Sequence, residues 1–279
     1  MNSYPSPLSE TSGRVALVLG AIKGIGKGIG LDLAQRGFCV ALTYHDWPEA
    51  LPQMRDDFAV FGDKCAIFKV DLRECDAVSQ LICDVVSHFG RLDVLVNNIE
   101  RGGWPVVHGP YTPDQWDLEM ETTLRAKHWV FDNVLPHLKA GGKGCVVNLS
   151  SIAGVVGRSG PASLIFNDGY AAANRGISLL TESWARVAAP EVRVNEIMLG
   201  LVATRHGEHT RGWGLLEAHQ KQALLDHTLL RRMGTIEDVV KAVRFVIDEA
   251  PFMSGSVIRL DGGYVLGGDK VDPMPPGVL

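Results

Sequence analysis

The chain has 279 residues, of which 46% are hydrophobic and 21% are charged, and its formal net charge is −5. This composition is that of an ordinary globular protein with enough apolar side chains for a substantial core. A net negative charge without a Lys/Arg cluster argues against a nucleic-acid surface and against an anionic membrane surface as a partner.

The N-terminal segment is polar and contains proline, and it lacks the basic start and apolar run of a secretory signal. No apolar segment is long enough to span a bilayer. The five cysteines include no Cys-x-x-Cys pair, which favours reduced thiols over a disulfide framework or a metal site. We therefore expect a soluble cytoplasmic protein without a bound metal, and a flexible tail at residues 1–12.

The first predicted element is a central strand over residues 15–19, since VALVL is too uniformly apolar for a half-exposed strand. A glycine-rich turn and a helical pattern follow. Gly20 allows the tight turn, Gly24 lets the backbone approach a ligand, and Gly26 lets the helix pack against the strand. The alternative is a purely structural turn, but strand, glycine loop and helix in this order predict a pyrophosphate site at the helix N-terminus.

The second predicted strand, FCVALTY, ends where a dinucleotide fold selects its cofactor. An acidic residue there binds the adenosine ribose of NADH, whereas a positive charge admits the 2′-phosphate of NADPH. Tyr44 and His45 occupy this place, and Lys23 in the first loop is able to reach the same corner. The pattern favours NADPH over NADH. Asp46 is the residue that speaks against NADPH if its carboxylate repels the phosphate. The alternative is that this carboxylate points to solvent.

Strands and helices alternate through the rest of the chain. The third predicted strand ends in Asp71 and Leu72, the fourth in Asn98 and the fifth in Ser151. Since ligands of parallel sheets bind at the carboxyl ends of the strands, these residues are expected near the glycine loop. Further strands are predicted at residues 192–199 and 256–263, and helices at residues 28–37, 49–61, 77–89, 116–138, 170–188 and 236–247. The alternation predicts a single α/β domain with a doubly wound parallel sheet.

By these motifs the sequence resembles the short-chain dehydrogenases/reductases from Gly13 to about Gly267. The resemblance is carried by LGAIKGIG, VDL, LDVLVNN, VVNLSSIAG, YAAAN and the segment from RRMGTIEDVV to RLDGGY. It implies a Rossmann-type, three-layer α/β/α domain at residues 13–267 and a C-terminal tail at residues 268–279. It also implies an NAD(P)-dependent oxidoreductase of a small carbonyl or alcohol, and a homo-oligomer, either tetramer or dimer.

The resemblance implies roles for single residues. Ser151 matches the catalytic serine, Tyr170 matches the catalytic tyrosine, and Asn174 stands at the position of the catalytic lysine. In such a site the tyrosine hydroxyl exchanges the proton on the substrate oxygen while the serine hydroxyl holds that oxygen. The residues implied to bind the cofactor are Gly20, Lys23, Gly24, Ile25, Gly26, Tyr44, His45, Asp71, Leu72, Asn98, Tyr170, Asn174, Val202 and Thr204.

Several positions differ from the family pattern, and they concern the residues that transfer the proton or the residues beside the substrate. Asn174 replaces a lysine whose charge would favour the tyrosine phenolate, and Thr123 replaces a helix asparagine. The family's Asn-Asn-Ala-Gly reads NNIE at residues 97–100. Ser151 and Tyr170 are 19 positions apart, a longer spacing than in the family, although a longer loop need not separate the pair in space.

Two residues are candidates to replace the missing cation. Arg175 is one residue beyond Asn174, about 100° around the helix, and is expected to be solvated. Lys127 follows Thr123 by one turn and is able to face the site, but we expect it at the surface.

Two function classes therefore stay open. The first is an NADPH-dependent reductase in which a protonated Tyr170 donates directly. The second is a catalytically impaired relative that binds a nucleotide or a partner as a sensor or scaffold.

The sequence gives little information about the substrate-binding side of the site. Residues from about 205 to 229 replace a segment that forms a flap in the family, and their glycines and histidines suit a flexible polar lid. His206, His209 and His219 lack a rigid ligand set, so solvated histidines are expected rather than a metal site. The loop that contains Trp104 is expected to form another wall of the site.

Overall fold

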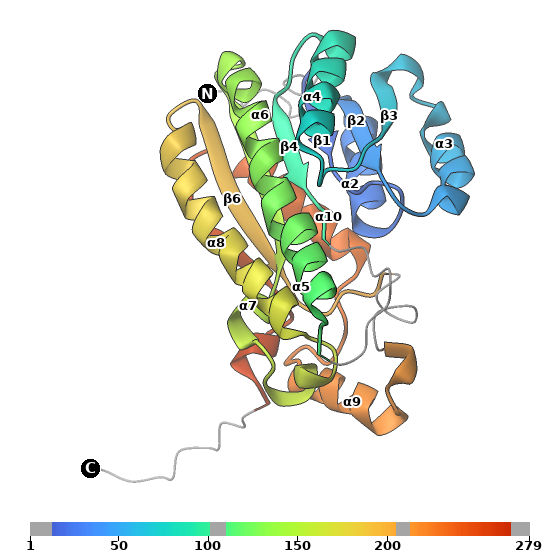
Figure 1. Cartoon of the computed structure of the whole chain (residues 1–279), viewed down its shortest axis with the longest axis vertical. Helices are drawn as coiled ribbons and strands as arrows, with labels where there is room; N and C mark the ends of the chain where they lie inside the picture. The colour runs from blue at the N-terminus through green and yellow to red at the C-terminus, as the bar shows by residue number, and fades with distance from the viewer. Residues whose placement is uncertain (1–12, 101–109, 205–212, 269–279) are drawn as a thin grey trace, which may run out of the picture.

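The computed structural model describes residues 13–100, 110–204 and 213–268 (Figure 1). Within them, seven parallel strands form one sheet in the order β3-β2-β1-β4-β5-β6-β7, so the strand order reverses between β1 and β4. This confirms the predicted single, doubly wound domain. The strands are β1 (Val15–Val18), β2 (Cys39–Tyr44), β3 (Cys65–Lys69), β4 (Val94–Asn97), β5 (Gly144–Ser151), β6 (Val192–Leu199) and β7 (Val257–Leu260).

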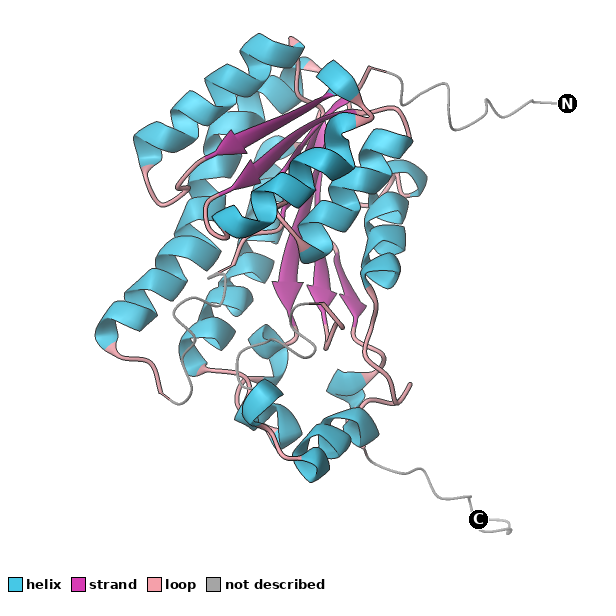
Figure 2. Ribbon diagram, turned by 90° about the vertical axis from the view of Figure 1, so that its right-hand side faces the viewer, coloured by secondary structure: helices cyan, strands magenta, loops and turns pink. Residues whose placement is uncertain are grey.

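Helices cover both faces of the sheet and make three layers (Figures 1 and 2). The apolar residues of β1 alternate between two cores: Ala16 and Val18 belong to one, and Val15 and Leu17 to the other. The first core is covered by α2 (Gly24–Gln35), α3 (Leu51–Ala59) and α10 (Ile236–Arg244), and the second by α4 (Cys75–Phe89), α6 (Ala126–Ala140) and α8 (Asp168–Ala188).

The helix expected over residues 116–138 is longer and is interrupted. It begins with α5 (Pro113–Glu119), which is capped by a reciprocal pair of hydrogen bonds between Thr112 and Gln115. A π-helical segment, Met120–Arg125, joins α5 to α6. Because a π turn holds more residues than an α turn, it changes which side chains of α6 face the sheet.

The long segment between Ser151 and Tyr170 forms short helices. They are α7 (Ala153–Val156) and a 3-10 helix (Gly160–Leu164). The latter is fixed to the C-terminal part of the domain, because the Ala162 N–H donates to the hydroxyl of Tyr264 at 2.8 Å.

The described part of the predicted lid begins at residue 213 and contains α9 (Ala218–His227). Its Leu224 is buried in a small core with Ile152, Ala162, Met198 and Tyr264. This part of the lid is therefore a packed helix. Residues 205–212 of the lid lie outside the described residues, as do the predicted tails except for residue 268.

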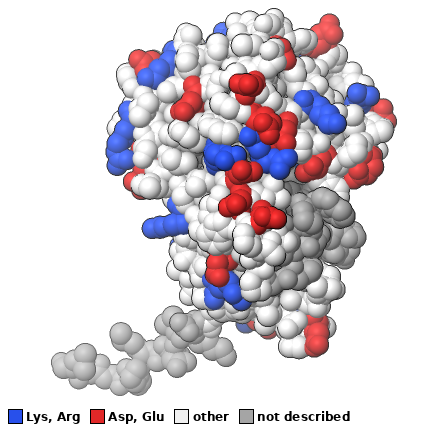
Figure 3. Space-filling model, viewed as in Figure 1, with Lys and Arg blue, Asp and Glu red and all other residues white. Residues whose placement is uncertain are grey.

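On the face seen in Figure 3, basic and acidic side chains are interspersed. Among the described residues, no helix combines the length and the apolar character that crossing a membrane requires.

Candidate active site

The carboxyl ends of the strands open into a pocket of about 510 Å³. It lies at the point where the strand order reverses, the place where open α/β sheets bind their ligands. The sheet brings nearly all the predicted site residues to its wall. These are Gly20, Lys23, Gly24, Ile25, Tyr44, His45, Asp71, Leu72, Asn98, Ser151, Tyr170, Asn174, Val202 and Thr204.

The glycines of the loop after β1 differ in what surrounds them. A Cβ on Gly26 would lie 2.3 Å from the carbonyl oxygen of Gly20, so Gly26 serves the packing of α2 and does not line the pocket. Gly24 has a φ of +62°, and a Cβ there would meet no atom within 4 Å. The backbone at Gly24 is therefore open to the pocket. The Asn98 side-chain amide donates to the Gly20 carbonyl at 3.1 Å and holds the loop in place.

The N-terminus of α2 fits a diphosphate. Its N-cap residue, Lys23, makes no side-chain cap, and the first turn holds no acidic residue. The helix N-terminus therefore presents backbone N–H groups and a positive dipole end. The Lys23 ammonium lies 3.0 Å from the centroid of the Trp47 ring, which keeps a positive charge beside the pocket.

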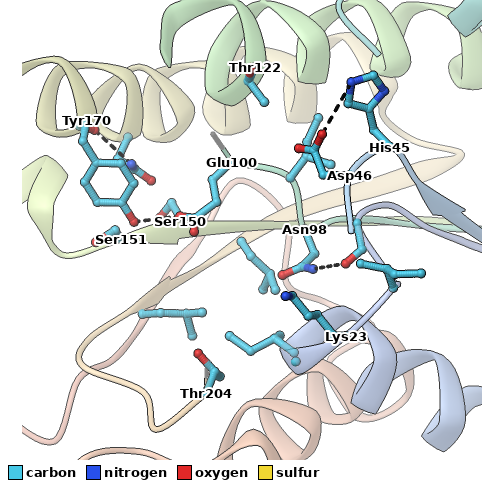
Figure 4. A pocket seen from close by; sticks show the side chains of 18 of the residues that line it. Lys23, His45, Asp46, Asn98, Glu100, Thr122, Ser150, Ser151, Tyr170 and Thr204 are labelled. Atoms are coloured by element: carbon cyan, nitrogen blue, oxygen red, sulfur yellow. Dashed lines mark hydrogen bonds and ion pairs between the residues drawn. The ribbon is translucent and has the colours of Figure 1, made fainter. Parts of the chain in front are cut away.

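The end of the pocket beside β2 holds a cluster of ionisable side chains. His45 Nε2 lies 3.7 Å from Asp46 Oδ1 and 3.6 Å from Asp71 Oδ2 (Figure 4 draws His45 and Asp46). Arg73, which the sequence analysis did not consider, donates to both carboxylate oxygens of Asp71. The hydrogen bonds from this guanidinium lower the pKa of Asp71. Its negative charge is thereby compensated within the pocket wall.

Tyr170 and Ser151 lie together at the other end of the pocket (Figure 4). The Tyr170 hydroxyl donates to Glu100 Oε2 at 3.0 Å. Ser151 Oγ accepts from the Ala153 N–H at 3.1 Å, whereas the Ser150 hydroxyl donates to the buried carboxylate of Glu196. Ser151 is thus the serine whose hydroxyl hydrogen is available to a bound molecule.

Asn174 lies one helical turn after Tyr170 and is buried. Its side-chain amide donates to the main-chain carbonyl of Tyr170 at 2.9 Å. The amide brings no charge to the tyrosine. Arg175 is exposed, as expected.

The prediction of a surface position for Lys127 is wrong. Its side chain is 1% exposed, lines the pocket, and donates through Nζ to the Leu149 carbonyl at 2.7 Å. Burial lowers its pKa to about 8. The sequence held a signal for this position, because Lys127 precedes Phe131, Val134 and Leu138 at the spacing of one buried helical stripe.

Two further acidic residues were missed by the sequence analysis. Glu100 is the last residue of NNIE, where the family pattern has glycine. An acidic residue at that position was the sequence signal for it. Glu119 is buried at the end of α5 and accepts from the Tyr111 hydroxyl at 2.8 Å and from Thr123 Oγ1 at 2.5 Å. The residue at the position of the family's helix asparagine therefore binds a buried carboxylate.

The sequence analysis named four other residues beside the site. Trp104, His206 and His209 lie outside the described residues. His219 is exposed and lies 3.1 Å from the carboxylate of Glu217.

Comparison with known proteins agrees with this fold. A family model described as enoyl-(acyl carrier protein) reductase matches residues 20–265. The 3-oxoacyl-(acyl-carrier-protein) reductase FabG of Staphylococcus aureus is 31% identical over 255 residues, which cover 90% of this chain and 98% of that protein. The FabG of Thermotoga maritima is 30% identical over 258 residues, covering 91% and 98%. A crystal structure from Sinorhizobium meliloti 1021, described as a short-chain alcohol dehydrogenase, has a TM-score of 0.79 at 28% identity and covers 92% of this chain and 98% of its own.

Proposed function

Because the chain belongs to the short-chain dehydrogenase/reductase family and is a short-chain reductase or dehydrogenase, we propose that it reduces a small carbonyl compound with NADPH. Tyr170 donates the proton to the substrate oxygen in this proposal. The observation that carries it is a single pocket with the glycine loop at one end and the Tyr170 hydroxyl at the other. A bound nicotinamide cofactor supplies the hydride.

The pocket offers a place for each part of the dinucleotide. The open backbone at Gly24 and the N-terminus of α2 suit the diphosphate. We assign Tyr44, His45, Asp71 and Leu72 to the adenosine end, Asn98, Tyr170 and Asn174 to the nicotinamide ribose, and Val202 and Thr204 to the carboxamide.

The preference for NADPH rests on charge. Lys23 and His45 lie at the adenosine end, and Asp71 is compensated by Arg73. NADPH differs from NADH by a 2′-phosphate, which would gain from the nearby Lys23 ammonium. No acidic residue ends β2, so an acid that would bind the ribose of NADH and repel this phosphate is absent from that position. Asp46 opposes this preference, because its carboxylate is negative; its side chain is half exposed beside His45.

The substrate end suits a carbonyl oxygen held by two hydroxyl groups. Ser151 orients the oxygen and Tyr170 protonates it as the hydride arrives at the carbon. The curated relatives are named 3-oxoacyl-(acyl-carrier-protein) reductases. We therefore propose 3-oxoacyl thioesters as the first carbonyl compounds to assay.

The first test is a titration of the purified protein with NADPH and separately with NADH, followed by tryptophan fluorescence. Trp47 and Trp213 both line the pocket, so bound dinucleotide should quench them. We expect NADPH to bind more tightly than NADH. Lys23→Met should weaken NADPH binding about tenfold and leave NADH binding nearly unchanged, since a lost charge pair costs on the order of 1 kcal/mol at a partly exposed site.

Lys27→Met is the matched control. Lys27 is in the same helix, but its ammonium pairs with Asp57 at 2.6 Å and does not line the pocket. Equal affinity for both dinucleotides would contradict the NADPH preference. Binding without turnover of any carbonyl would favour the non-catalytic alternative, and no binding at all would contradict the proposed function.

A further inference from the structure

A buried ammonium group lies at the carboxyl end of β5. Lys127 reaches from the first turn of α6, and its Nζ donates to the Leu149 carbonyl at 2.7 Å. Leu149 directly precedes Ser150 and Ser151 in the strand. The charge is therefore held at the edge of the sheet where Ser151 and Tyr170 line the pocket.

Carboxylates from three elements act on this ammonium. They belong to Glu100 after β4, Glu196 in β6 and Glu119 at the end of α5. Each opposes the effect of burial on the Lys127 pKa, and Glu100 has the largest effect of the three. Arg175 of α8 is the further cation nearby, and it acts on Glu196.

Glu100 connects Lys127 to the proposed proton donor, because it also accepts the hydrogen bond of the Tyr170 hydroxyl at 3.0 Å. When Tyr170 gives up its proton, a phenolate is left beside this carboxylate. Two neighbouring negative charges in a partly desolvated pocket repel each other. Asn174 cannot offset that repulsion, since it is uncharged and its amide donates to the Tyr170 carbonyl.

We propose that Lys127 supplies the missing positive charge from α6 and acts through Glu100 as a positioning residue for proton transfer at Tyr170. The inference rests on the proposed function. In the reduction the O–H bond of Tyr170 breaks, its electron pair stays on the phenolate oxygen, and a new O–H bond forms on the substrate oxygen. The substrate carbon accepts the hydride from NADPH. The Lys127 ammonium offsets the charge that develops on Tyr170 and Glu100 together.

The proposal predicts how the rate depends on pH. Lys127 carries its charge below a pKa of about 8 and loses it above that value. The stabilisation of the phenolate is therefore present at low pH and is lost as the pH rises. We expect kcat for carbonyl reduction to fall as the pH rises through about 8.

The test compares kcat between pH 7 and 9.5 in the wild type and in four variants. Lys127→Met should lower kcat at pH 7 roughly 10- to 100-fold, which is less than the about 10²- to 10³-fold loss for a donor in direct contact with developing charge, because Lys127 acts through Glu100. It should also remove the fall near pH 8. Lys127→Arg should keep the activity and move the fall to higher pH. The double variant Lys127→Met with Asn174→Lys should recover part of the lost rate. Lys143→Met, at an exposed position outside the pocket, should behave as the wild type.

A second measurement needs no cofactor. In the protein labelled with 13C at the lysine Cε atoms, one NMR resonance should titrate with a midpoint near 8 and be absent from Lys127→Met. Glu100→Gln removes a negative charge that raises the Lys127 pKa, so the midpoint of that resonance should move to lower pH. An unchanged midpoint would overturn the coupling between Glu100 and Lys127.

Different results would overturn the role of Lys127 and the proposed carbonyl reduction. A wild-type protein that turns over carbonyls while Lys127→Met keeps the same rate and pH profile would overturn the role of Lys127 alone. A wild-type protein that reduces no carbonyl with either dinucleotide would overturn the proposed function, and the role of Lys127 in proton transfer with it, whatever the NMR titration shows.

Discussion

At the scale of single residues, the charged groups in the pocket beside Tyr170 are Lys127 and Glu100 rather than a lysine at position 174. Asn174 removes a cation from α8, whereas Lys127 places one on α6 and Glu100 adds an anion after β4. A buried lysine costs free energy unless carboxylates lie near it, and three do. The three carboxylates therefore offset part of the cost of burying Lys127.

Replacing Tyr170 by phenylalanine tests the proton donor. The variant keeps the ring but loses the hydroxyl that donates to Glu100. We expect carbonyl reduction to fall at least 100-fold, since general acid catalysis contributes about 10²- to 10⁴-fold. The NADPH affinity measured by fluorescence should stay within a few fold of the wild type, which separates lost chemistry from lost binding. Activity close to that of the wild type would show that another group donates the proton.

At the scale of elements, α10 depends on its N-terminal cap. Thr235 Oγ1 accepts from the Asp238 N–H at 3.1 Å, and Asp238 in turn accepts from Thr235 and from Arg232. The hydrogen bond from Arg232 lowers the pKa of Asp238. The cap fixes α10 against α2, where a Cβ on Gly28 would lie 2.4 Å from the side chain of Ile236.

Thr235→Ala should therefore destabilise the protein. The expected loss is about 1 kcal/mol in the free energy of unfolding, the usual cost of removing a helix cap. Urea denaturation at pH 7 measures it. Thr235→Ser keeps the hydroxyl and should keep most of the stability, so equal losses in the two variants would show that the methyl group, and not the cap, is responsible.

At the scale of the whole molecule, we propose a homo-oligomer, either dimer or tetramer, in which α8 forms part of a subunit contact. Leu179 and Val187 of α8 are 66% and 58% exposed, while Trp184 of the same helix is 4% exposed. A second copy of the chain would cover these apolar side chains.

Sedimentation velocity tests this assembly with Leu179→Asp. A charge buried in an apolar contact is costly, so the variant should sediment as a smaller species than the wild type. Val60→Asp changes a residue that is 83% exposed at the end of α3 and should leave the assembly unchanged. A wild-type protein that sediments as a monomer would contradict the proposal.

The sequence by itself determined the sheet and the glycine loop. The apolar run at residues 15–19 and the glycines after it are local signals, since burial on both faces and a close backbone approach restrict residue types directly. The shared location of the residues that end the strands then followed, because parallel strands present their carboxyl ends at one edge of the sheet. Asp71, Asn98 and Ser151 accordingly meet in one pocket.

Only the tertiary structure decided the charges around Tyr170. The spacing of Lys127 places it on the buried stripe of α6, but it does not show which charged groups meet it, and the π-helical segment before α6 is not visible in the residue pattern. Two of the three carboxylates that act on Lys127 lie far from it in sequence: Glu100 follows β4, and Glu196 lies in β6. Whether such groups compensate one another depends on distance and burial in the folded chain, and those are properties of packing rather than of local sequence.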